Sequence, residues 1–364
     1  MESMPRQRRQ KEQTATRRAT INDVAQLAGV SKGAASRALS PDGGRIGRET
    51  IARVRAAAEE LGYVPNIRAR SLSAARAYAI GWVMRRDPDV LTEDPFFPSF
   101  LAGVEAAISV RNYTLVLSIV TDELEEPTYR RLASEGRVDG FLLSDVRTRE
   151  SRFALLADLQ VPAVALGAPG PSCPIPAVGI DDRKGAELAT EHLLASGRQR
   201  IAHVTGAPGY IHTHNRQLGW RAALRKAGKS YCAEGIADFT PEGGAKATRA
   251  LLDSPEPPDA IFYDNDLMAI AGMAAAMSRG LRVPRDLAVV GFDNIPMAAH
   301  VAPPLSSVAT DTRDWGKLAA LTLLDAIDGR GTQGQVMLQS GLVVRRSSHA
   351  VPKHANGQGG VSNQ

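Results

Sequence analysis

Residues 20–39 read TINDVAQLAGVSKGAASRAL, and this stretch decides the fold of the front of the chain. Thr20 and Asp23 match a capping box, so we predict a first helix over residues 21–28 that ends at the following glycine. Ser31 can cap a second helix directly after that glycine-containing turn. Two short helices joined in this way are typical of the helix-turn-helix motif, which binds DNA.

The second helix, over residues 32–39, is expected to carry the DNA contacts of the motif. Its start faces base edges in this geometry, so Lys32 and Arg37 can reach guanine or phosphate, and Ser36 can bind phosphate. A third amphipathic helix over residues 48–61 completes a small core. The predicted DNA-binding residues of this part of the chain are Thr20, Ser31, Lys32, Gly33, Ser36 and Arg37.

A short basic segment, PNIRARSL at residues 65–72, follows the three helices. Its proline ends the third helix, and Asn66 can cap a short hinge helix. Arginines that flank an exposed Leu72 suit a minor groove, where the leucine would act as an apolar wedge. The predicted DNA-binding residues of the hinge are Asn66, Arg68, Ala69, Arg70 and Leu72.

The distribution of charge supports a nucleic-acid partner. The 364-residue chain has a net charge of +5, but residues 1–76 hold 15 Lys/Arg and 7 Asp/Glu, a net of +8, which leaves −3 for the rest. An excess of positive charge confined to one module indicates a polyanion-binding domain attached to an ordinary body. Residues 1–19 are predicted to be a disordered basic arm, and the polar residues 349–364 a tail.

The remaining composition predicts a cytoplasmic protein without a cofactor. Cys173 and Cys232 are far apart and lack partners at metal-ligand spacing, so neither a disulfide framework nor a metal site is expected. His212 and His214 are weak evidence for a metal and are interpreted as loop residues near a cleft. We find no signal-peptide pattern and no bilayer-length apolar run, so export and membrane insertion are not expected.

Beyond residue 77, short apolar runs alternate with amphipathic helices, which predicts doubly wound α/β lobes with parallel sheets. The predicted strands are residues 79–84, 114–120, 140–144, 161–167, 201–206, 260–263 and 287–292. Ligands of such sheets bind beyond the carboxyl ends of the strands.

Several motifs closely resemble the LacI/GalR (lactose repressor) family of bacterial transcription regulators. They include AGVS at residues 28–31, LGYVPN at residues 61–66, DPFF at residues 94–97 and NDLMA at residues 265–269. The resemblance covers about residues 20–348. It implies a helix-turn-helix domain (20–65), a hinge helix (66–76) and a two-lobed core like periplasmic sugar-binding proteins (77–348). Lobe 1 is expected at about residues 77–177 and 306–330, and lobe 2 at about residues 178–305 and 331–348.

The same resemblance implies an effector in the cleft between the lobes, with no catalytic residues. A sugar site needs planar polar groups for its hydroxyls and an apolar face for its ring. The candidates near strand ends are Asp94, Phe96, Asp145, His212, Arg216, Trp220, Asn265 and Asp293. Trp220 is either a stacking platform or a core residue, and Asp266 is either a helix N-cap or a ligand contact.

These features predict a homodimeric repressor of a pseudo-palindromic operator, controlled by a mono- or oligosaccharide. The alternative effectors are a nucleobase or another small polar metabolite. A cytoplasmic sugar-binding protein without a regulatory role is a weaker alternative because such a protein would not need the helix-turn-helix domain. Induction and co-repression are both compatible with the sequence.

Overall fold

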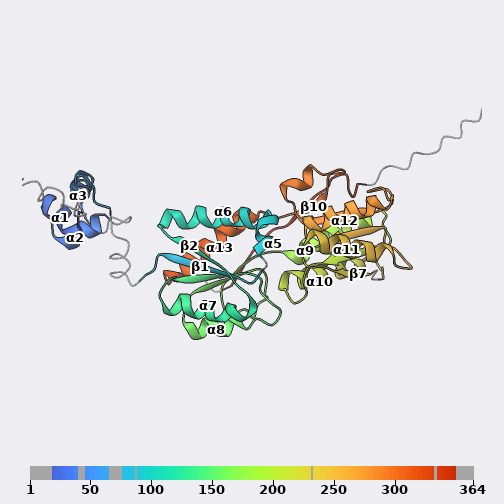
Figure 1. The fold of residues 1–364 in the computed structure, drawn as a ribbon, viewed down its shortest axis with the longest axis horizontal. Coiled ribbons are helices and arrows are strands. Elements are labelled where there is room, and N and C mark those ends of the chain that lie inside the picture. Colours follow the sequence, from blue (N-terminus) through green and yellow to red (C-terminus); the bar gives the residue numbers. More distant parts are fainter. Residues whose placement is uncertain are drawn as a thin grey trace, which may run out of the picture. The chain divides into compact units, whose positions relative to one another are not determined.

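A computed structural model gives the fold (Figure 1) and describes residues 19–39, 46–64, 76–86, 88–230, 233–331 and 334–349. The chain divides into two compact units, Met1–Arg76 and Ala77–Gln364. The basic arm up to residue 18, the hinge residues 66–75 and the tail from residue 350 lie outside the described residues. No helix in the described ranges combines the length and apolarity that a membrane crossing requires.

The first unit, which we call the headpiece, contains three described helices, and the bounds of each lie within one residue of those predicted from the sequence. They are α1 (Ile21–Leu27), α2 (Lys32–Ala38) and α3 (Arg48–Glu60). Thr20 accepts from the backbone N–H of Asp23, and the Asp23 carboxylate accepts from the Thr20 backbone N–H at 2.7 Å, which completes the capping box. The Ser31 hydroxyl accepts from the Ala34 N–H at 3.2 Å. The helices enclose a core made largely of alanines around Val24 and Val54.

The first lobe contains a six-stranded parallel sheet. Its strands, in spatial order, are β11 (Gln335–Leu338), β5 (Ala177–Ile180), β4 (Ala163–Leu166), β3 (Gly140–Leu143), β1 (Ala79–Met84) and β2 (Thr114–Ile119). Every residue of β1 is buried, because helices cover both faces of the sheet. Alternate residues point to opposite faces, so Ile80 and Trp82 join one core cluster and Val83 joins another.

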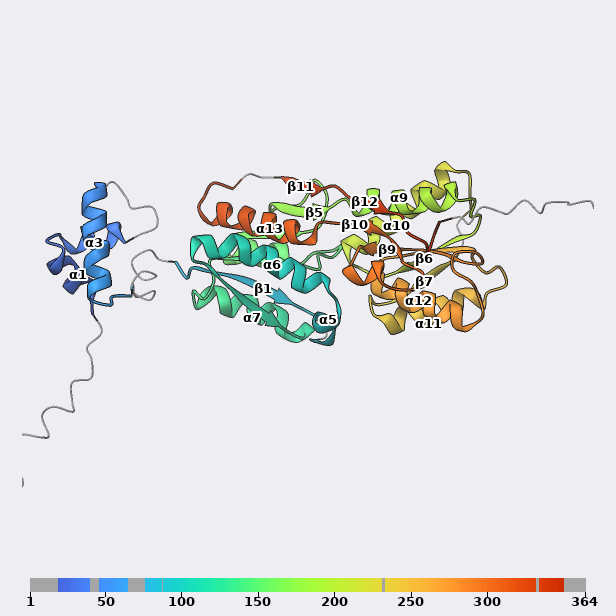
Figure 2. The same cartoon turned by 90° about the horizontal axis from the view of Figure 1, so that it is seen from above.

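The helices of the first lobe form two layers around this sheet (Figure 2). One layer is α6 (Phe96–Ile108) with α13 (Thr312–Ile327), and the other is α7 (Asp122–Ser134) with α8 (Arg152–Leu159). The short elements α5 (Pro88–Glu93) and η2 (Ser109–Arg111) lie before and after α6 in the chain. Glycines allow α6 and α13 to pack closely, since a Cβ at Gly103 would lie 1.9 Å from the Arg313 carbonyl oxygen.

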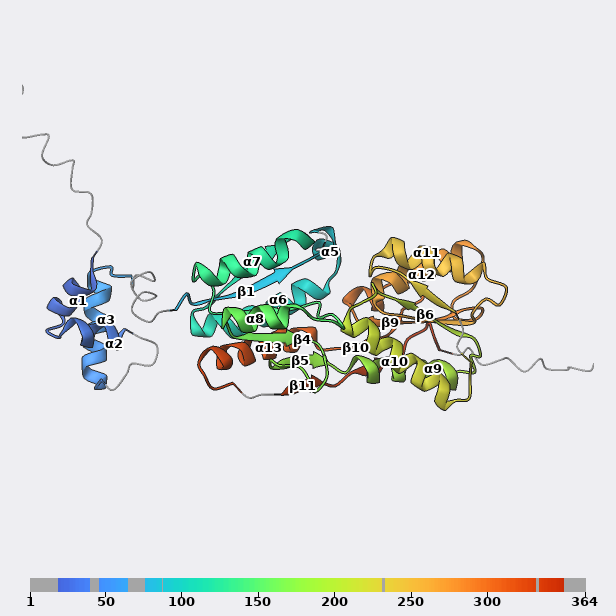
Figure 3. The ribbon, with the colours of Figure 1, turned by 90° about the horizontal axis from the view of Figure 1, so that it is seen from below.

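The second lobe repeats the architecture with a sheet that has one antiparallel edge strand. Its spatial order is β12 (Gly341–Val343), β10 (Ser306–Ala309), β9 (Ala288–Asp293), β8 (Ala260–Tyr263), β6 (Ile201–Thr205) and β7 (Glu234–Ile236), and β12 is antiparallel to β10. One face is covered by α11 (Pro241–Leu252) and α12 (Asp266–Ser278), and the other by α9 (Asp182–Ala195) and α10 (Ile211–Lys226). The short η3 (Pro296–Ala299) follows β9. Figure 3 shows α9 and α10 side by side.

The lobes divide at residues that differ from the predicted boundaries. The predicted boundaries placed β11 and most of β5 in lobe 2, but both strands belong to the first sheet. They placed β10 in lobe 1, but this strand belongs to the second sheet. The chain therefore crosses between the lobes three times, after β5, after β10 and after β11. Apolar periodicity indicates where a strand lies but not which sheet it hydrogen-bonds to, so the boundaries were wrong by a strand at each crossing.

Candidate functional site

A pocket lies between the two lobes, beyond the carboxyl ends of strands from both sheets. Clefts of this kind, at the carboxyl ends of parallel strands, are common places for small-molecule sites. The first lobe contributes Trp82, Arg86, Asp94, Phe96, Phe97, Ser144, Asp145, Leu166, Gly167, Ile180 and Trp315. The second lobe contributes Asp182, His212, Arg216, Phe239, Asn265 and Asp293.

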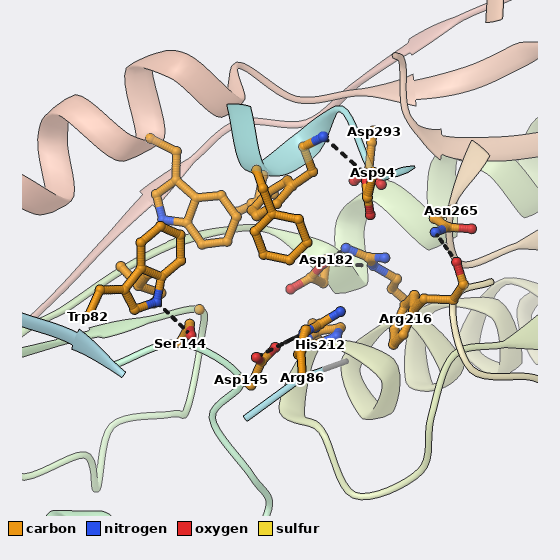
Figure 4. Close-up of a pocket in the computed structure, with 17 residues that line it drawn as sticks. Trp82, Arg86, Asp94, Ser144, Asp145, Asp182, His212, Arg216, Asn265 and Asp293 are labelled. Atoms are coloured by element: carbon orange, nitrogen blue, oxygen red, sulfur yellow. Dashed lines mark hydrogen bonds and ion pairs between the residues drawn. The ribbon is translucent and has the colours of Figure 1, made fainter. Parts of the chain in front are cut away.

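Seven of the eight side chains predicted from the sequence line this one pocket, some of which Figure 4 shows converging from both lobes. They are Asp94, Phe96, Asp145, His212, Arg216, Asn265 and Asp293. Each lies at or after the end of a strand, or within the first two turns of a helix or just before it, at the cleft edge of its lobe. Parallel sheets bring all their carboxyl ends to one edge, which is why residues so distant in sequence meet.

Trp220 is the exception, and its prediction as a stacking platform was wrong. The side chain is 0% exposed and packs among core residues of the second lobe, where its indole Nε1 donates to the Ile201 carbonyl at 3.3 Å. Trp220 lies four residues after Arg216 on α10. The side chain is buried between the helix and the sheet and does not line the pocket.

Arg216 is held against the floor of the pocket by fixed partners. Its Nε donates to Oδ1 of Asp182 at 2.8 Å, and its Nη1 donates to the backbone carbonyl of Asp264. The guanidinium carbon also lies 3.7 Å from the centre of the Phe292 ring, a cation–π arrangement. Asp182, which was not among the residues predicted from the sequence, is therefore the partner of Arg216.

Asp264 itself is fixed by a buried histidine. His203 and Asp264 are both 0% exposed, and the His203 Nε2 lies 2.8 Å from Asp264 Oδ1. The other carboxylate oxygen accepts from the Gly206 N–H at 2.8 Å. Although burial opposes its charge, this histidine, Arg216 and the Gly206 N–H hold the pKa of Asp264 below its ordinary value. The carbonyl that receives Arg216 therefore sits on a rigid support.

A second arginine, Arg86, forms the matching pair in the first lobe. Its Nε donates to Asp145 Oδ2 at 3.0 Å, and its Nη2 donates to the other oxygen of the same carboxylate. Burial opposes the charge of Asp145, yet Arg86 holds the pKa of that carboxyl below its ordinary value. Arg86 was not predicted from the sequence, although its place two residues after β1 is a signal that could have identified it.

The apolar face of the pocket is formed by aromatic rings that the structure brings from distant segments. Phe96 and Trp315 are partly exposed and meet edge to face at a centroid distance of 5.6 Å. The Trp315 indole is oriented by its Nε1, which donates to the Val178 carbonyl at 2.8 Å. The indole of Trp82 is fixed in the same way by the Ser144 hydroxyl at 2.8 Å. Trp315, which is partly exposed, thus provides the aromatic surface predicted for Trp220, whereas Trp82 is only 1% exposed.

Asn265 lines the pocket and also makes two hydrogen bonds that stabilise the fold around it. Its Oδ1 accepts from the Met268 N–H at 2.9 Å and caps α12, and its Nδ2 donates to the Phe239 carbonyl at 3.0 Å. Asp266, which we considered as the cap, instead accepts from the Ser307 hydroxyl and the Ile295 N–H below the surface. The cap and the buried acid are therefore adjacent but different residues.

Two carboxylates of the pocket accept no hydrogen bond from an arginine in the part of the chain that the structure describes. Asp94 is 9% exposed and accepts from the Phe96 N–H at 2.9 Å, and burial raises its pKa. Burial raises the pKa of Asp293 to about 7, with a contribution from the negative charge of Asp94. Asp182 is also raised, to about 6, because burial outweighs its pairing with Arg216.

His212 lies in the first turn of α10, and its neighbour His214 lies in the same helix, so the interpretation of both as loop residues was wrong. The His212 ring stacks on Tyr210 at 5.4 Å with an interplanar angle of 10°. Burial, then the charge of Arg216, lowers its pKa to about 3. His212 is therefore a neutral hydrogen-bonding group at physiological pH.

The two lobes are also joined along one rim of the pocket. The Thr148 N–H donates to the Gly209 carbonyl at 2.9 Å, and the Ile211 N–H donates to the Val146 carbonyl at 2.8 Å. These bonds connect the loop after β3 to the loop before α10. The loop that carries Asp145 is thus tied to the helix that carries His212 and Arg216.

In the headpiece, the predicted DNA contacts on the second helix share one solvent-exposed surface. Ser31, Lys32, Gly33, Ser36 and Arg37 are all exposed, whereas Ala35 and Ala38 face the core. Thr20 is half-buried at the start of α1. The hinge residues Asn66, Arg68, Ala69, Arg70 and Leu72 lie outside the described residues, so their predicted roles stay predictions.

Comparisons with known proteins agree with both units. The family descriptions "Bacterial regulatory proteins, lacI family" and "Periplasmic binding protein-like domain" match residues 20–66 and 190–348. The HTH-type transcriptional regulator CelR of Thermobifida fusca is 34% identical over 336 residues, 91% of this chain and 98% of CelR. A CelR–cellobiose complex matches with a TM-score of 0.70 at 33% identity, covering 91% of this chain and 100% of that chain. A lac repressor dimer bound to operator and the anti-inducer ONPF gives 0.77 at 28% identity, covering 91% and 99%.

A helix-turn-helix unit joined to a two-lobed domain with a pocket between its lobes defines a ligand-responsive DNA-binding regulator. The extent of the match to CelR gives the family, and this chain belongs to the LacI family of bacterial transcription regulators. It is a sequence-specific DNA-binding transcription regulator whose activity a small-molecule effector controls.

Proposed function

We propose that the chain is a repressor whose effector is a sugar bound in the pocket between the lobes. The observation that carries this proposal is the composition of the pocket wall. Carboxylate, amide and guanidinium groups from both lobes surround the partly exposed rings of Phe96 and Trp315. Planar polar groups suit the vicinal hydroxyls of a sugar, and aromatic rings suit the apolar face of its ring.

The similarity to CelR supports the same class of ligand, since that protein has been solved with cellobiose. We propose that the effector is bound and released unchanged rather than converted. A mono- or oligosaccharide recovered intact by chromatography after incubation with the protein would agree with this. Its conversion to a new species would contradict it.

On the DNA side, we propose that α2 enters the major groove of a pseudo-palindromic operator. Lys32 and Arg37 then contact bases or phosphates, while Ser31 and Ser36 bind phosphates. The hinge residues Asn66, Arg68, Ala69, Arg70 and Leu72 are proposed to contact the minor groove. Such an activity places the protein in the cytoplasm, with the chromosome.

A two-fold operator requires two copies of the headpiece, and α12 offers a surface for a second copy of the chain. The helix has apolar residues on its outer side as well as in the core. Ala274 and Met277 are exposed there, and Leu267 and Ile270 are partly exposed at helical spacing along the same side. An apolar stripe of this kind favours a homodimer.

The proposed mechanism is thermodynamic linkage. An effector that contacts Asp94 and Asp145 from one lobe and Arg216 and Asp293 from the other favours one arrangement of the lobes. DNA binding by two linked headpieces then changes by the same coupling free energy. Whether the effector induces or co-represses depends on which arrangement the operator favours.

The test combines two measurements on the full-length protein. An operator is selected in vitro from a random duplex library, and a panel of mono- and oligosaccharides, cellobiose included, is compared with nucleobases by thermal shift and calorimetry. We expect a selected palindrome whose affinity changes when a sugar binds. Binding of nucleobases with no response to any sugar would overturn the sugar proposal, and failure to select any sequence would overturn the operator proposal.

The hinge is tested separately by Leu72→Ala. Loss of the wedge should weaken binding to the selected operator, while the sugar affinity measured by calorimetry stays the same. Unchanged operator affinity in a gel-shift titration would remove Leu72 from the DNA contacts.

A further inference from the structure

We propose that the effector of this pocket carries a positively charged group, such as the ammonium of an amino sugar, which binds between Asp94 and Asp293. The inference rests on the proposed function in that it takes the pocket as the effector site. It adds the charge of the ligand, which neither the fold nor the relatives specify.

Each of the two arginines of the pocket is already paired with a buried carboxylate. Arg86 is held by Asp145, and its guanidinium lies over the rings of Phe97, Tyr210 and Phe239 at 5.5, 5.7 and 5.6 Å. Arg216 is held by Asp182 and by the Asp264 carbonyl. A phosphate or carboxylate on a ligand would have to share one of these arginines with its buried carboxylate, so two negative charges would compete for one cation.

The two remaining acids of the pocket are Asp94 and Asp293. Asp94 comes from the first lobe and Asp293 from the second, and Figure 4 shows them at the same side of the pocket. Asp94 accepts from the Phe96 N–H. Within the described parts of the chain, the Asp293 carboxylate accepts no hydrogen bond. Two carboxylates that face one cavity, each without a hydrogen-bonded cation among the described residues, form an acceptor site, and the charge of Arg216 acts on both from nearby.

The charged groups of the whole pocket wall do not balance one another. The lining holds two arginines and four aspartates, and His212 is kept neutral by burial, so two negative charges are left unbalanced. A buried site with such an excess takes up protons or binds a cation. The raised pKa of Asp293 is the signature of the first outcome in the free protein.

A metal ion is one way to supply the missing charge, but the geometry does not favour it. Among the described residues, no group of three or more His, Cys, Asp and Glu side chains is arranged to hold a metal. An ammonium group needs only acceptors, and charge-assisted hydrogen bonds to carboxylates are roughly twice as strong as neutral ones. The aromatic rings beside the acids would carry the rest of an amino sugar.

The experiment compares matched ligands that differ only in charge. Glucose, glucosamine and glucuronate are titrated into the full-length protein by calorimetry at pH 7.5, with the corresponding galactose and mannose triplets and with cellobiose beside its diamino analogue. We expect an amino sugar to bind about tenfold or more tightly than its neutral counterpart, and the uronate to bind weakest. In Asp293→Asn and Asp94→Asn the preference for the amine should fall to about twofold or less.

Asp253→Asn is the matched control, because Asp253 is an exposed aspartate of the same lobe that pairs with Arg279 on the surface. It should retain the full preference, and thermal melting of all three variants reports whether each is folded. Equal or tighter binding of the neutral sugar would overturn the inference while the proposed function stands. A preference unchanged in both Asp→Asn pocket variants would also overturn it. If no sugar of any charge binds, the proposed function fails together with the inference.

Discussion

Arg216 of α10 donates from its Nε to Oδ1 of Asp182 at the start of α9, at 2.8 Å, with both side chains less than a tenth exposed. The pair depends on close packing of the two helices. A Cβ added to Gly219 would lie 2.2 Å from the Arg183 carbonyl oxygen, so only glycine fits at this contact. The close approach of the two helices therefore supports the buried ion pair, and the ion pair forms part of the pocket floor.

Removal of the arginine should abolish the effector response and leave operator binding intact. In Arg216→Ala, Asp182 becomes an unpaired buried acid, so we expect the free energy of unfolding to fall by about 3 kcal/mol or more. Calorimetry with the tightest-binding sugar of the panel and a gel shift with the selected operator check both parts. Arg216→Lys is the matched variant and should also fail, because an ammonium cannot reproduce the guanidinium fork. Normal sugar affinity in Arg216→Ala would refute the assignment.

Gly219→Ala tests the helix contact without a change of charge. The added methyl group must separate α10 from α9, so we expect a loss of about 1–3 kcal/mol of stability and weaker sugar binding. Urea unfolding and calorimetry measure the two effects. A variant as stable as the wild type, with the same sugar affinity, would show that the helices can part without cost.

Gly33→Ala in α2 should stabilise the helix, whereas Gly219→Ala should destabilise the protein. The nearest atom to an added Cβ there is 3.7 Å away, at the end of the Arg37 side chain, so the methyl group meets no clash. Alanine is favoured over glycine inside a helix by up to about 1 kcal/mol, and we expect α2 to become more stable by a similar amount. Slower amide hydrogen exchange of α2 in the full-length protein is the measurement. Faster exchange would contradict the prediction.

Asp293 makes the stability of the core depend on pH. Its pKa is raised from 3.8 to about 7, so the folded state binds a proton more tightly than the unfolded state. The stabilisation is complete below about pH 4 and is lost as the pH rises through about 7. The charged groups that act on it are Arg216, Asp94, Asp182, Asp264 and Asp266.

Asp293→Asn removes that proton-linked contribution. We expect the stability of the variant relative to the wild type to rise between pH 5 and pH 8, by about 2–3 kcal/mol at most. Urea unfolding at the two pH values, with Asp253→Asn as the surface control, gives the comparison. A difference between Asp293→Asn and wild type that is the same at both pH values would contradict the linkage.

The sequence by itself determined the elements whose causes are local. Thr20, Asp23 and Ser31 act within three residues of their own position, so the bounds of α1 and α2 followed from capping alone. Apolar runs located β1 and β8 at their observed residues, because burial on both faces leaves a continuous apolar stretch. Strand ends then pointed to Asp145 and Asp293, since function at parallel sheets gathers at one edge.

Only the tertiary structure decided which of these pieces meet. The assignment of β5, β10 and β11 to their sheets, the pairing of Arg216 with Asp182, and the exchange of Trp220 for Trp315 as an aromatic wall all depend on contacts between segments far apart in the chain. Such contacts are set by how whole helices pack on the sheets, as at Gly219, where one missing Cβ fixes the approach of α10 to α9. No periodicity within either helix carries that information.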